Sequence, residues 1–465
     1  MAQSVRTRAW PWWLLLAIVV LKAVALWIDP QVRLFLGDSA SYLHAASVDD
    51  WLPPDRSITY PMLIAQLAGA SRPLHALVLW QTAAGVFVAW MLGVLLAFRL
   101  GVPVRIAFAA ACLFALDPAQ LIYERMVMAE TFGFACFVAF LAAASSYLAR
   151  PRWPWLPLVA ALGVAAVSFR MNFLPVVLVI SVALPLLPLA AAESPRRWRV
   201  VAHAGIALIA VWFCHGQFRS WVGEQFDGKP GYIANAGFMR MGLVAPLIRP
   251  EHFTRVGLPP DYAARLDHDL ADPGTRPMQL WSPGGLADTL RKDGVDVNTI
   301  CRKLSAYAMR DDPLGVVLLG FRTLRGYFNP ASSAVRLQKD LGRDPMPYPD
   351  RVIASVREKW NEDLAGVAEK WTPASRWFAV GSNWLVFCLF ALAPLSLLDA
   401  WLHRRDPRRL QHVLVALFGL GLVATHVLFS NIASYRYLQP LPFFVLATAI
   451  PACLALRRPA FARRR

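Results

Sequence analysis

The hydrophobic positions of the chain fall into long runs separated by short polar segments. Ten of these runs have the length and composition of membrane-spanning helices: residues 10–28, 75–98, 106–120, 127–148, 155–169, 173–191, 200–216, 379–400, 411–430 and 436–455. The first run follows two arginines, as in a signal sequence. It is too long for the apolar part of a signal peptide, and no small-residue cleavage site follows it. We therefore predict an all-α polytopic membrane protein with about ten transmembrane helices, the first of them retained.

Composition supports this class. Of the 465 residues, 57% are hydrophobic and only 17% are charged, which is too apolar for a soluble protein of this length. The formal charge of +17 suggests nucleic acid at first, but the arginines gather in short loops between the apolar runs. Positive charge in such loops sets membrane topology, so we expect membrane lipids and no nucleic acid as partners. The cysteines form no CxxC pair and no disulfide framework.

The arginine-rich loops also predict orientation. They include Arg99 and Arg105, the segment 404–409 and the C-terminal tail, and all of them fall on one face if ten spans alternate. By the positive-inside rule this face is cytoplasmic. We therefore expect a multi-pass protein of the cell (inner or plasma) membrane with both termini in the cytoplasm.

A reporter fusion tests this topology. We expect a reporter fused after Arg465 to be cytoplasmic and one inserted near Pro345 to be external, because the arginine asymmetry places these positions on opposite faces. The measurement is the activity of a compartment-dependent reporter at each position. A cytoplasmic signal at Pro345 would contradict the site described below, since Asp38 and that region must share a face.

The spans divide the chain into three parts. These are a membrane module of about seven spans at 1–216, an external region at 217–376, and three further spans with a basic tail at 377–465. The external region is rich in Pro, Gly and Asp, and a loop of this length is more often functional than passive. In it we expect helices at 296–310 and 350–371, the latter with Asp350 as a cap, and an amphipathic helix at 313–328 that lies on the outer surface.

Unusual polar residues gather at the external ends of the spans. Asp38 directly follows the first run, and a carboxylate at the membrane surface is costly enough to suggest a role, although Asp is also a favoured N-cap for a helix that begins at Ser39. The other residues on this face are Tyr42, Arg56 and Tyr60 after the first run, Tyr123, Glu124, Arg125 and Glu130 near the fourth, Arg170 and Asn172 after the fifth, and Arg436 and Tyr437 at the last.

This mixture suits transfer of a group from a lipid phosphate. A carboxylate can take the proton from an acceptor hydroxyl, and arginine binds phosphate bidentately while always remaining charged. With arginines present, a divalent cation between Asp38 and the phosphate is unnecessary, so we expect no cofactor. We also expect no metal at His252 or at 267–269 in the external region. Lys22, inside the first run, is expected to snorkel to the interface or to bind a lipid phosphate.

Two other functions are compatible with a polytopic protein. A lipid or solute transporter, or a flippase, tends to bind its substrate near the midplane between repeated halves, whereas this chain shows neither a repeat nor a midplane charge cluster. A polymer-binding protein without catalysis would depend on the external region alone. This function would not explain why acids and arginines occur together at the ends of four separate segments.

Five short motifs resemble the GT-C glycosyltransferases, the group that contains the protein O-mannosyltransferases and the aminoarabinose transferases of lipid A. The motifs are Gly37–Leu43, which resembles the first-loop signature, Thr59–Pro61 after an arginine, Ala129–Phe134 at the start of the fourth span, Arg170 after the fifth, and Arg436–Pro440. The resemblance covers roughly the first 216 residues and the last span. It does not cover the external region.

The resemblance implies an inverting transferase that moves a sugar from a polyprenyl-phosphate donor to a hydroxyl of a glycan, lipid or protein in the cell envelope, with Asp38 as the catalytic base. Some members have a second acid directly after the first, and Ser39 stands at that position here. Glu124 or Glu130 could supply the second acid, and Glu130 could instead support a loop from inside the bundle. The arginines and tyrosines named above would bind the donor.

Overall fold

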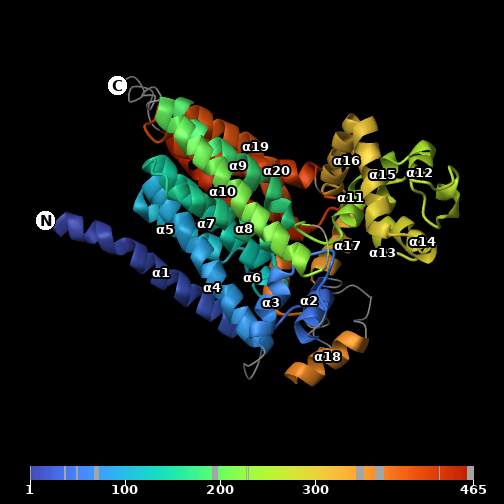
Figure 1. The fold of residues 1–465 in the computed structure, drawn as a ribbon. Coiled ribbons are helices and arrows are strands. Elements are labelled where there is room, and N and C mark those ends of the chain that lie inside the picture. Colours follow the sequence, from blue (N-terminus) through green and yellow to red (C-terminus); the bar gives the residue numbers. More distant parts are fainter. Residues whose placement is uncertain are drawn as a thin grey trace.

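The computed structural model is built from helices joined by short connections (Figure 1). It describes residues 2–35, 38–48, 51–67, 73–190, 197–226, 228, 230–341, 350–361, 371–428 and 430–457. Four features of the sequence analysis lie outside these residues: Gly37, the part of the 350–371 helix at 362–370, the reporter site at Pro345, and the tail after Arg457.

Eight helical segments among the described residues are long and apolar enough to cross a membrane. They are α1 (Ala2–Ile28), α4 (Pro73–Val94) with a π-helical turn (Leu95–Arg99), α7 (Glu130–Ala149), α9 (Leu174–Ala183) with its flanking 3₁₀ turns, α10 (Arg197–Glu224), α19 (Pro373–Leu402), α20 (Arg409–Leu428), and α21 (Leu441–Arg457) with the turn before it (Tyr435–Leu438). The chain is thus an all-helical, multi-pass membrane protein, as the sequence predicts.

The two other predicted spans contain shorter apolar helices, and the one at 106–120 breaks before Asp117, which caps the next helix. The shorter helices are α5 (Val104–Ala115) and α8 (Trp155–Phe169). At 1.5 Å per residue, helices of 12 and 15 residues are shorter than the roughly 30 Å hydrocarbon core of a bilayer. The protein crosses the membrane ten times only if these two helices span it together with their flanking residues. The number ten therefore stays a prediction.

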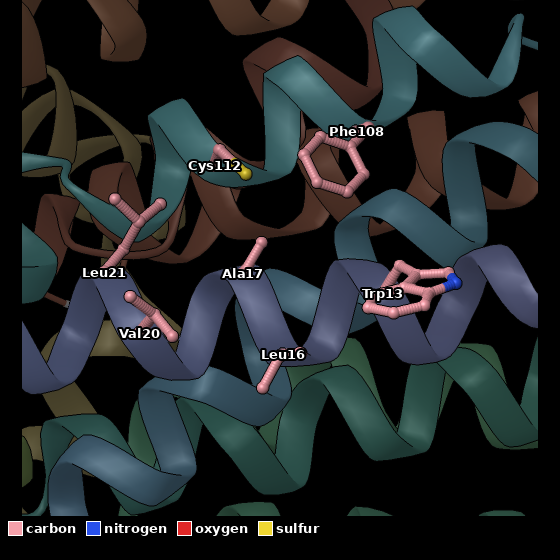
Figure 2. Close-up of a pocket in the computed structure, with 7 residues that line it drawn as sticks. All are labelled: Trp13, Leu16, Ala17, Val20, Leu21, Phe108 and Cys112. Carbon is pink, nitrogen blue, oxygen red and sulfur yellow. The ribbon is translucent and has the colours of Figure 1, made fainter.

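The bundle has one large apolar core. Its centre is aromatic: the Phe137 ring stacks on that of Phe173 at 4.4 Å, and Phe418 and Phe444 lie beside it. Outside this centre, α1 runs along α4 and α5 (Figure 1). An apolar groove of about 580 Å³ opens between α1 and α5 (Figure 2), lined by Trp13, Leu16, Ala17, Val20, Leu21, Phe108 and Cys112. No lining residue carries a charge, so the groove is not where ionic chemistry takes place.

The external region has a small core of its own beyond one end of the bundle (Figure 1). The helices of this region are α11 (Ala236–Val244), α12 (Pro250–Arg255), α13 (Arg276–Trp281), α14 (Leu286–Lys292), α15 (Val297–Asp311), α16 (Pro313–Gly326), α17 (Pro330–Asp340) and α18 (Asp350–Trp360). Helices α11 to α15 form its core, whereas α18 packs against α2 (Asp38–Ser47). The predicted helix at 296–310 is confirmed by α15, which Asp296 caps through the Thr299 amide at 3.0 Å. A helix is also present at 313–326, and its position on a membrane surface stays a prediction.

Two extended segments hold the ends of several helices together. The segment after α1 pairs with the segment after α6 (Pro118–Tyr123): the Arg33 amide donates to the Arg125 carbonyl at 2.7 Å, and the Val127 amide donates to the Arg33 carbonyl at 2.8 Å. The Asp29 carboxylate accepts from the Ala374 amide in the first turn of α19. The starts of α2 (Asp38–Ser47), α7 and α19 therefore lie at one end of the bundle.

Candidate functional site

Asp38, the first residue of α2, is paired with two arginines. One carboxylate oxygen accepts from Arg56 Nη1 at 2.6 Å and the other accepts from Arg436 Nη1. Arg56 lies before α3 (Thr59–Gln66), whereas Arg436 lies nearly four hundred residues further along the chain. Burial raises the pKa of Asp38, but the charges of Arg436 and Arg56 outweigh this effect and hold the pKa well below its usual range. Asp38 is thus an ionised carboxylate at neutral pH, with arginines on both of its oxygens.

A second ion pair lies beside the first. Glu130, at the start of α7, accepts from Arg170 Nη1, and Arg170 caps the end of α8. Gly133 on α7 makes room for this pair, because a Cβ there would lie 2.6 Å from Arg170 Cγ. The Glu130 side chain is nearly fully buried, so the pair is shielded from water and its attraction is strengthened.

Tyr437 links the two ion pairs. Its hydroxyl accepts from Arg436 Nη2 at 2.9 Å, and the Arg170 guanidinium lies 5.5 Å from the centre of its ring. The ring of Phe35 covers the Arg436 guanidinium from the other side at 4.8 Å. We call Asp38, Arg56, Glu130, Arg170, Arg436 and Tyr437 the charged cluster; its members come from the ends of several helices that are distant in the sequence.

The remaining aromatic and amide residues of the predicted site border the charged cluster or support it. Tyr42 lies under the Arg56 guanidinium at 5.9 Å and packs edge-on against Tyr60 at 4.9 Å. Tyr60 is fully buried and donates to Gln81 at 2.8 Å, so it holds the position of Tyr42. Asn172 lies in the turn after Arg170, and its buried Oδ1 lacks a hydrogen-bond partner among the described residues.

Glu124 does not join the charged cluster. It forms a buried ion pair with Lys22 of α1, and both side chains are almost fully excluded from solvent. Gly85 of α4 borders the pair so closely that a Cβ there would collide with the Glu124 carboxylate. The expectation that Lys22 snorkels to the interface is wrong, because a carboxylate inside the bundle meets its ammonium group. A catalytic role for Glu124 would require this pair to open.

Arg125 is also engaged elsewhere. Its guanidinium donates to three backbone carbonyls, those of Asp29 and Leu121 at 2.7 and 2.6 Å and that of Ala25 at 2.7 Å. These carbonyls belong to the end of α1, the residue after it, and α6. Arg125 therefore ties α1 to α6 in this structure, and the structure does not bring it together with Arg56, Arg170 and Arg436.

Two residues at the site carried no signal in the sequence. Asp340, at the end of α17, accepts from the Tyr123 hydroxyl at 2.9 Å and from the Tyr435 amide at 3.3 Å, directly before Arg436. Trp281 of the external region lies 5.8 Å from the Arg56 guanidinium. Both reach the site from the region that the family resemblance does not cover, and only their tertiary contacts reveal them.

The buried carboxyl group of Asp340 should make the free energy of unfolding depend on pH. Burial raises its pKa to about 6 from an ordinary value of 3.8, although the bond from Tyr123 opposes this shift. The native state therefore binds the proton more tightly than the unfolded chain, and the resulting stabilisation is lost as pH rises from about 4 through 6. We expect the unfolding free energy of Asp340→Asn, measured relative to that of wild type, to increase by on the order of 3 kcal/mol over this interval.

The measurement is the difference in unfolding free energy between Asp340→Asn and wild type as a function of pH. Asp350→Asn, an exposed carboxylate at the start of α18, is the matched control. A difference for Asp340→Asn that stays constant between pH 4 and 7 would contradict the raised pKa.

Histidines pair with acids at two places among the described residues. His252 Nε2 lies 3.1 Å from the Asp311 carboxylate. Within the described residues, one group of three could hold a metal ion: Asp399, His403 and His412, at the connection between α19 and α20. The sequence analysis missed this group because its members lie at the ends of two apolar runs.

Comparisons with protein-family models, with curated proteins and with solved structures find no match to this chain. The fold and the site define its class: an all-helical, multi-pass membrane protein with paired acids and arginines at one end of the bundle. Any particular activity therefore has to be argued from the chemistry of the charged cluster.

Proposed function

We propose that the protein is a membrane glycosyltransferase of the GT-C type, which moves a sugar from a polyprenyl-phosphate donor to a hydroxyl acceptor on the external face. The observation that carries this proposal is the meeting of one ionised carboxylate, Asp38, with Arg56 and Arg436, beside the Arg170–Glu130 pair. It combines a candidate proton acceptor with several candidate phosphate ligands in a shielded site. A lipid-linked donor also accounts for the location of such a site at the ends of membrane helices.

Donor binding would redistribute the ion pairs of the charged cluster. In the structure, Arg56, Arg170 and Arg436 are paired with Asp38, Glu130 and Asp55, the last at 2.9 Å from Arg56. The donor phosphate offers oxygens with the geometry that guanidinium groups prefer. If Arg56 and Arg436 turn to the phosphate, Asp38 loses the charges that lower its pKa and becomes a stronger base. The donor would therefore activate the catalytic carboxylate.

In the proposed reaction, the acceptor oxygen attacks the anomeric carbon from the side opposite the phosphate. The bond between this carbon and the phosphate oxygen breaks, and its electron pair leaves with the polyprenyl phosphate. Asp38 takes the proton of the acceptor hydroxyl, and the sugar is transferred with inversion. The arginines stabilise the negative charge that develops on the leaving phosphate. Glu130 holds Arg170 in place for this role.

The direct test is the identity of the bound lipid and of the product. We expect lipid extracts of the purified protein, analysed by mass spectrometry, to contain a polyprenyl phosphate or its glycosylated form. The purified protein should then release polyprenyl phosphate from such a donor when an envelope-derived hydroxyl acceptor is supplied. A protein that carries its lipid across vesicle membranes but never cleaves the sugar–phosphate bond would be a transporter, and this result would overturn the proposal.

Lysine replacements test the phosphate ligands. We expect at least two of Arg56→Lys, Arg125→Lys, Arg170→Lys and Arg436→Lys to weaken donor binding about tenfold or more, because an ammonium group cannot form the bidentate pair. The measurement is the affinity for a radiolabelled polyprenyl-phosphate sugar in nanodiscs. Given its three carbonyl partners, Arg125→Lys should act mainly on stability.

Arg265→Lys is the matched control, because Arg265 is half-exposed and pairs with Asp293 in the external region. It should bind donor as wild type does. If Arg56→Lys, Arg170→Lys and Arg436→Lys also bound donor normally, the phosphate ligands would have to be sought elsewhere.

A further inference from the structure

A buried group of one carboxylate and two imidazoles lies at the end of the bundle opposite the charged cluster. Asp399 is close to the end of α19, a helix of 30 residues and therefore roughly 45 Å long, whose other end begins beside Asp29. His403 follows the same helix, and His412 is in the first turn of α20. Asp399 and His412 are 0% exposed and His403 is 8% exposed. The group is thus separate from the proposed catalytic chemistry.

The three side chains converge on the Asp399 carboxylate. Nδ1 of His412 lies 2.8 Å from one carboxylate oxygen, and Nδ1 of His403 lies 3.0 Å from the other. The two rings are stacked face to face with their centres 3.8 Å apart. All three candidate ligand atoms lie within 4.8 Å of one another. Ligand atoms on a tetrahedral zinc ion with bonds of about 2.0–2.1 Å are about 3.3 Å apart, so small side-chain movements would bring these three atoms onto three of the four positions around such an ion.

The group also has unsatisfied polar atoms. Nε2 of His412 and Oγ of Ser396, one turn earlier on α19, are buried without a hydrogen-bond partner among the described residues, and Oδ1 of Asp399 faces His403 Nδ1 at 3.0 Å without a hydrogen bond to it. Neutral imidazoles leave the buried carboxylate without a counter-charge, and an uncompensated buried charge is expensive. Of the neighbouring arginines, those at 404, 405 and 408 are exposed to solvent, and Arg409 at the start of α20 is half-buried. A cation held directly by the three side chains would remove this cost.

We propose that Asp399, His403 and His412 form a binding site for a divalent transition-metal ion of the zinc type. Imidazole nitrogens with one carboxylate are typical ligands of zinc, whereas calcium and magnesium prefer oxygen ligands. The metal joins the end of α19 to the start of α20 and stabilises the helical hairpin that carries α20 back to His426, beside Tyr437. Its role is structural, because the ligands are closed off inside the protein.

Metal binding can be measured on the full-length protein in nanodiscs, purified with a tag that contains no histidine. The protein is stripped with a chelator, loaded with zinc chloride, desalted and analysed by elemental mass spectrometry. We expect one zinc ion per chain and a melting temperature several degrees above that of the stripped protein. Loading with cobalt(II) should give the intense visible absorption bands of a tetrahedral site.

His412→Gln and His403→Gln should lose the stoichiometric metal and the cobalt bands. His203→Gln is the matched control, because His203 is a partly buried histidine of α10 that bonds to Tyr147 and not to an acid; it should keep both. If the stripped and loaded wild-type proteins melt at the same temperature and zinc remains substoichiometric, the group is a proton-bridged network and the metal site is wrong. The comparison uses wild type alone, so it stands even if a variant fails to fold.

Discussion

Asp38→Asn should bind the donor and fail to transfer its sugar. The amide cannot accept the acceptor proton, so we expect the transfer rate to fall by roughly 10²-fold or more. Donor binding should be retained or tightened, because the change removes the negative charge that competes with the phosphate for Arg56 and Arg436. Asn has nearly the same shape as Asp, and the Asp38 side chain binds arginines and does not cap the helix, so the start of α2 should persist. The measurements are single-turnover transfer and donor affinity on the same preparation.

Asp55→Asn is the matched control for this prediction. Asp55 also contacts Arg56, at 2.9 Å, but it does not contact Arg436. Its variant should keep most of the transfer rate, because a neighbour of Arg56 is altered while the proposed base is intact. Near-normal transfer by a folded Asp38→Asn protein would contradict the base assignment and direct the search to Glu130. A transporter or a binding protein would show no transferase activity in any variant.

The positions of the helices were largely predictable from the sequence. A helix that crosses lipid must satisfy its backbone internally and present apolar side chains along its whole length, so its sequence is a long apolar run. Every predicted run contains a helical segment, but the run at 106–120 is interrupted where α5 ends and Asp117 caps α6. The boundary near residue 216 was less predictable, because α10 continues to Glu224 without a break. The polar residues after position 216 continue the helix, so the change from apolar to polar sequence does not mark its end.

The composition of the charged cluster was predictable in part. Asp38, Arg170 and Arg436 each stand at the end of an apolar segment, and an alternating topology places these ends on one face. Their pairing was not predictable. Arg56 and Arg125 each follow an acid directly, yet Arg56 reaches Asp38 whereas Arg125 reaches backbone carbonyls. This difference depends on how the end of α1 packs against α6, which no local pattern encodes.

Contacts between distant segments account for the other residues that the sequence did not reveal. Asp340 meets Tyr123 across more than two hundred residues, and Asp399 meets His412 only because α19 and α20 form a hairpin. No local motif marks any of these residues in the sequence. They stand out only because they are buried beside a polar partner, and both properties depend on the tertiary fold.

Breaking the Lys22–Glu124 pair should have the largest effect on stability. Glu124→Gln leaves a buried ammonium group without its counter-charge, and the loss of one partner of a buried ion pair costs about 3–5 kcal/mol. The double variant Lys22→Met with Glu124→Leu replaces both charges with apolar side chains of similar length. It should recover most of the lost stability, because no uncompensated charge remains. The measurement is the free energy of unfolding in SDS titrations.

The same double variant separates a structural role of Glu124 from a catalytic one. If the pair only joins α1 to α6, the double variant should transfer sugar at a rate close to that of wild type, since Asp38 and its arginines are untouched. Lys22→Met alone is the control, because it leaves a buried carboxylate unpaired and should be destabilised as Glu124→Gln is. A stable double variant without transferase activity would contradict the structural role and return Glu124 to the candidate catalytic acids.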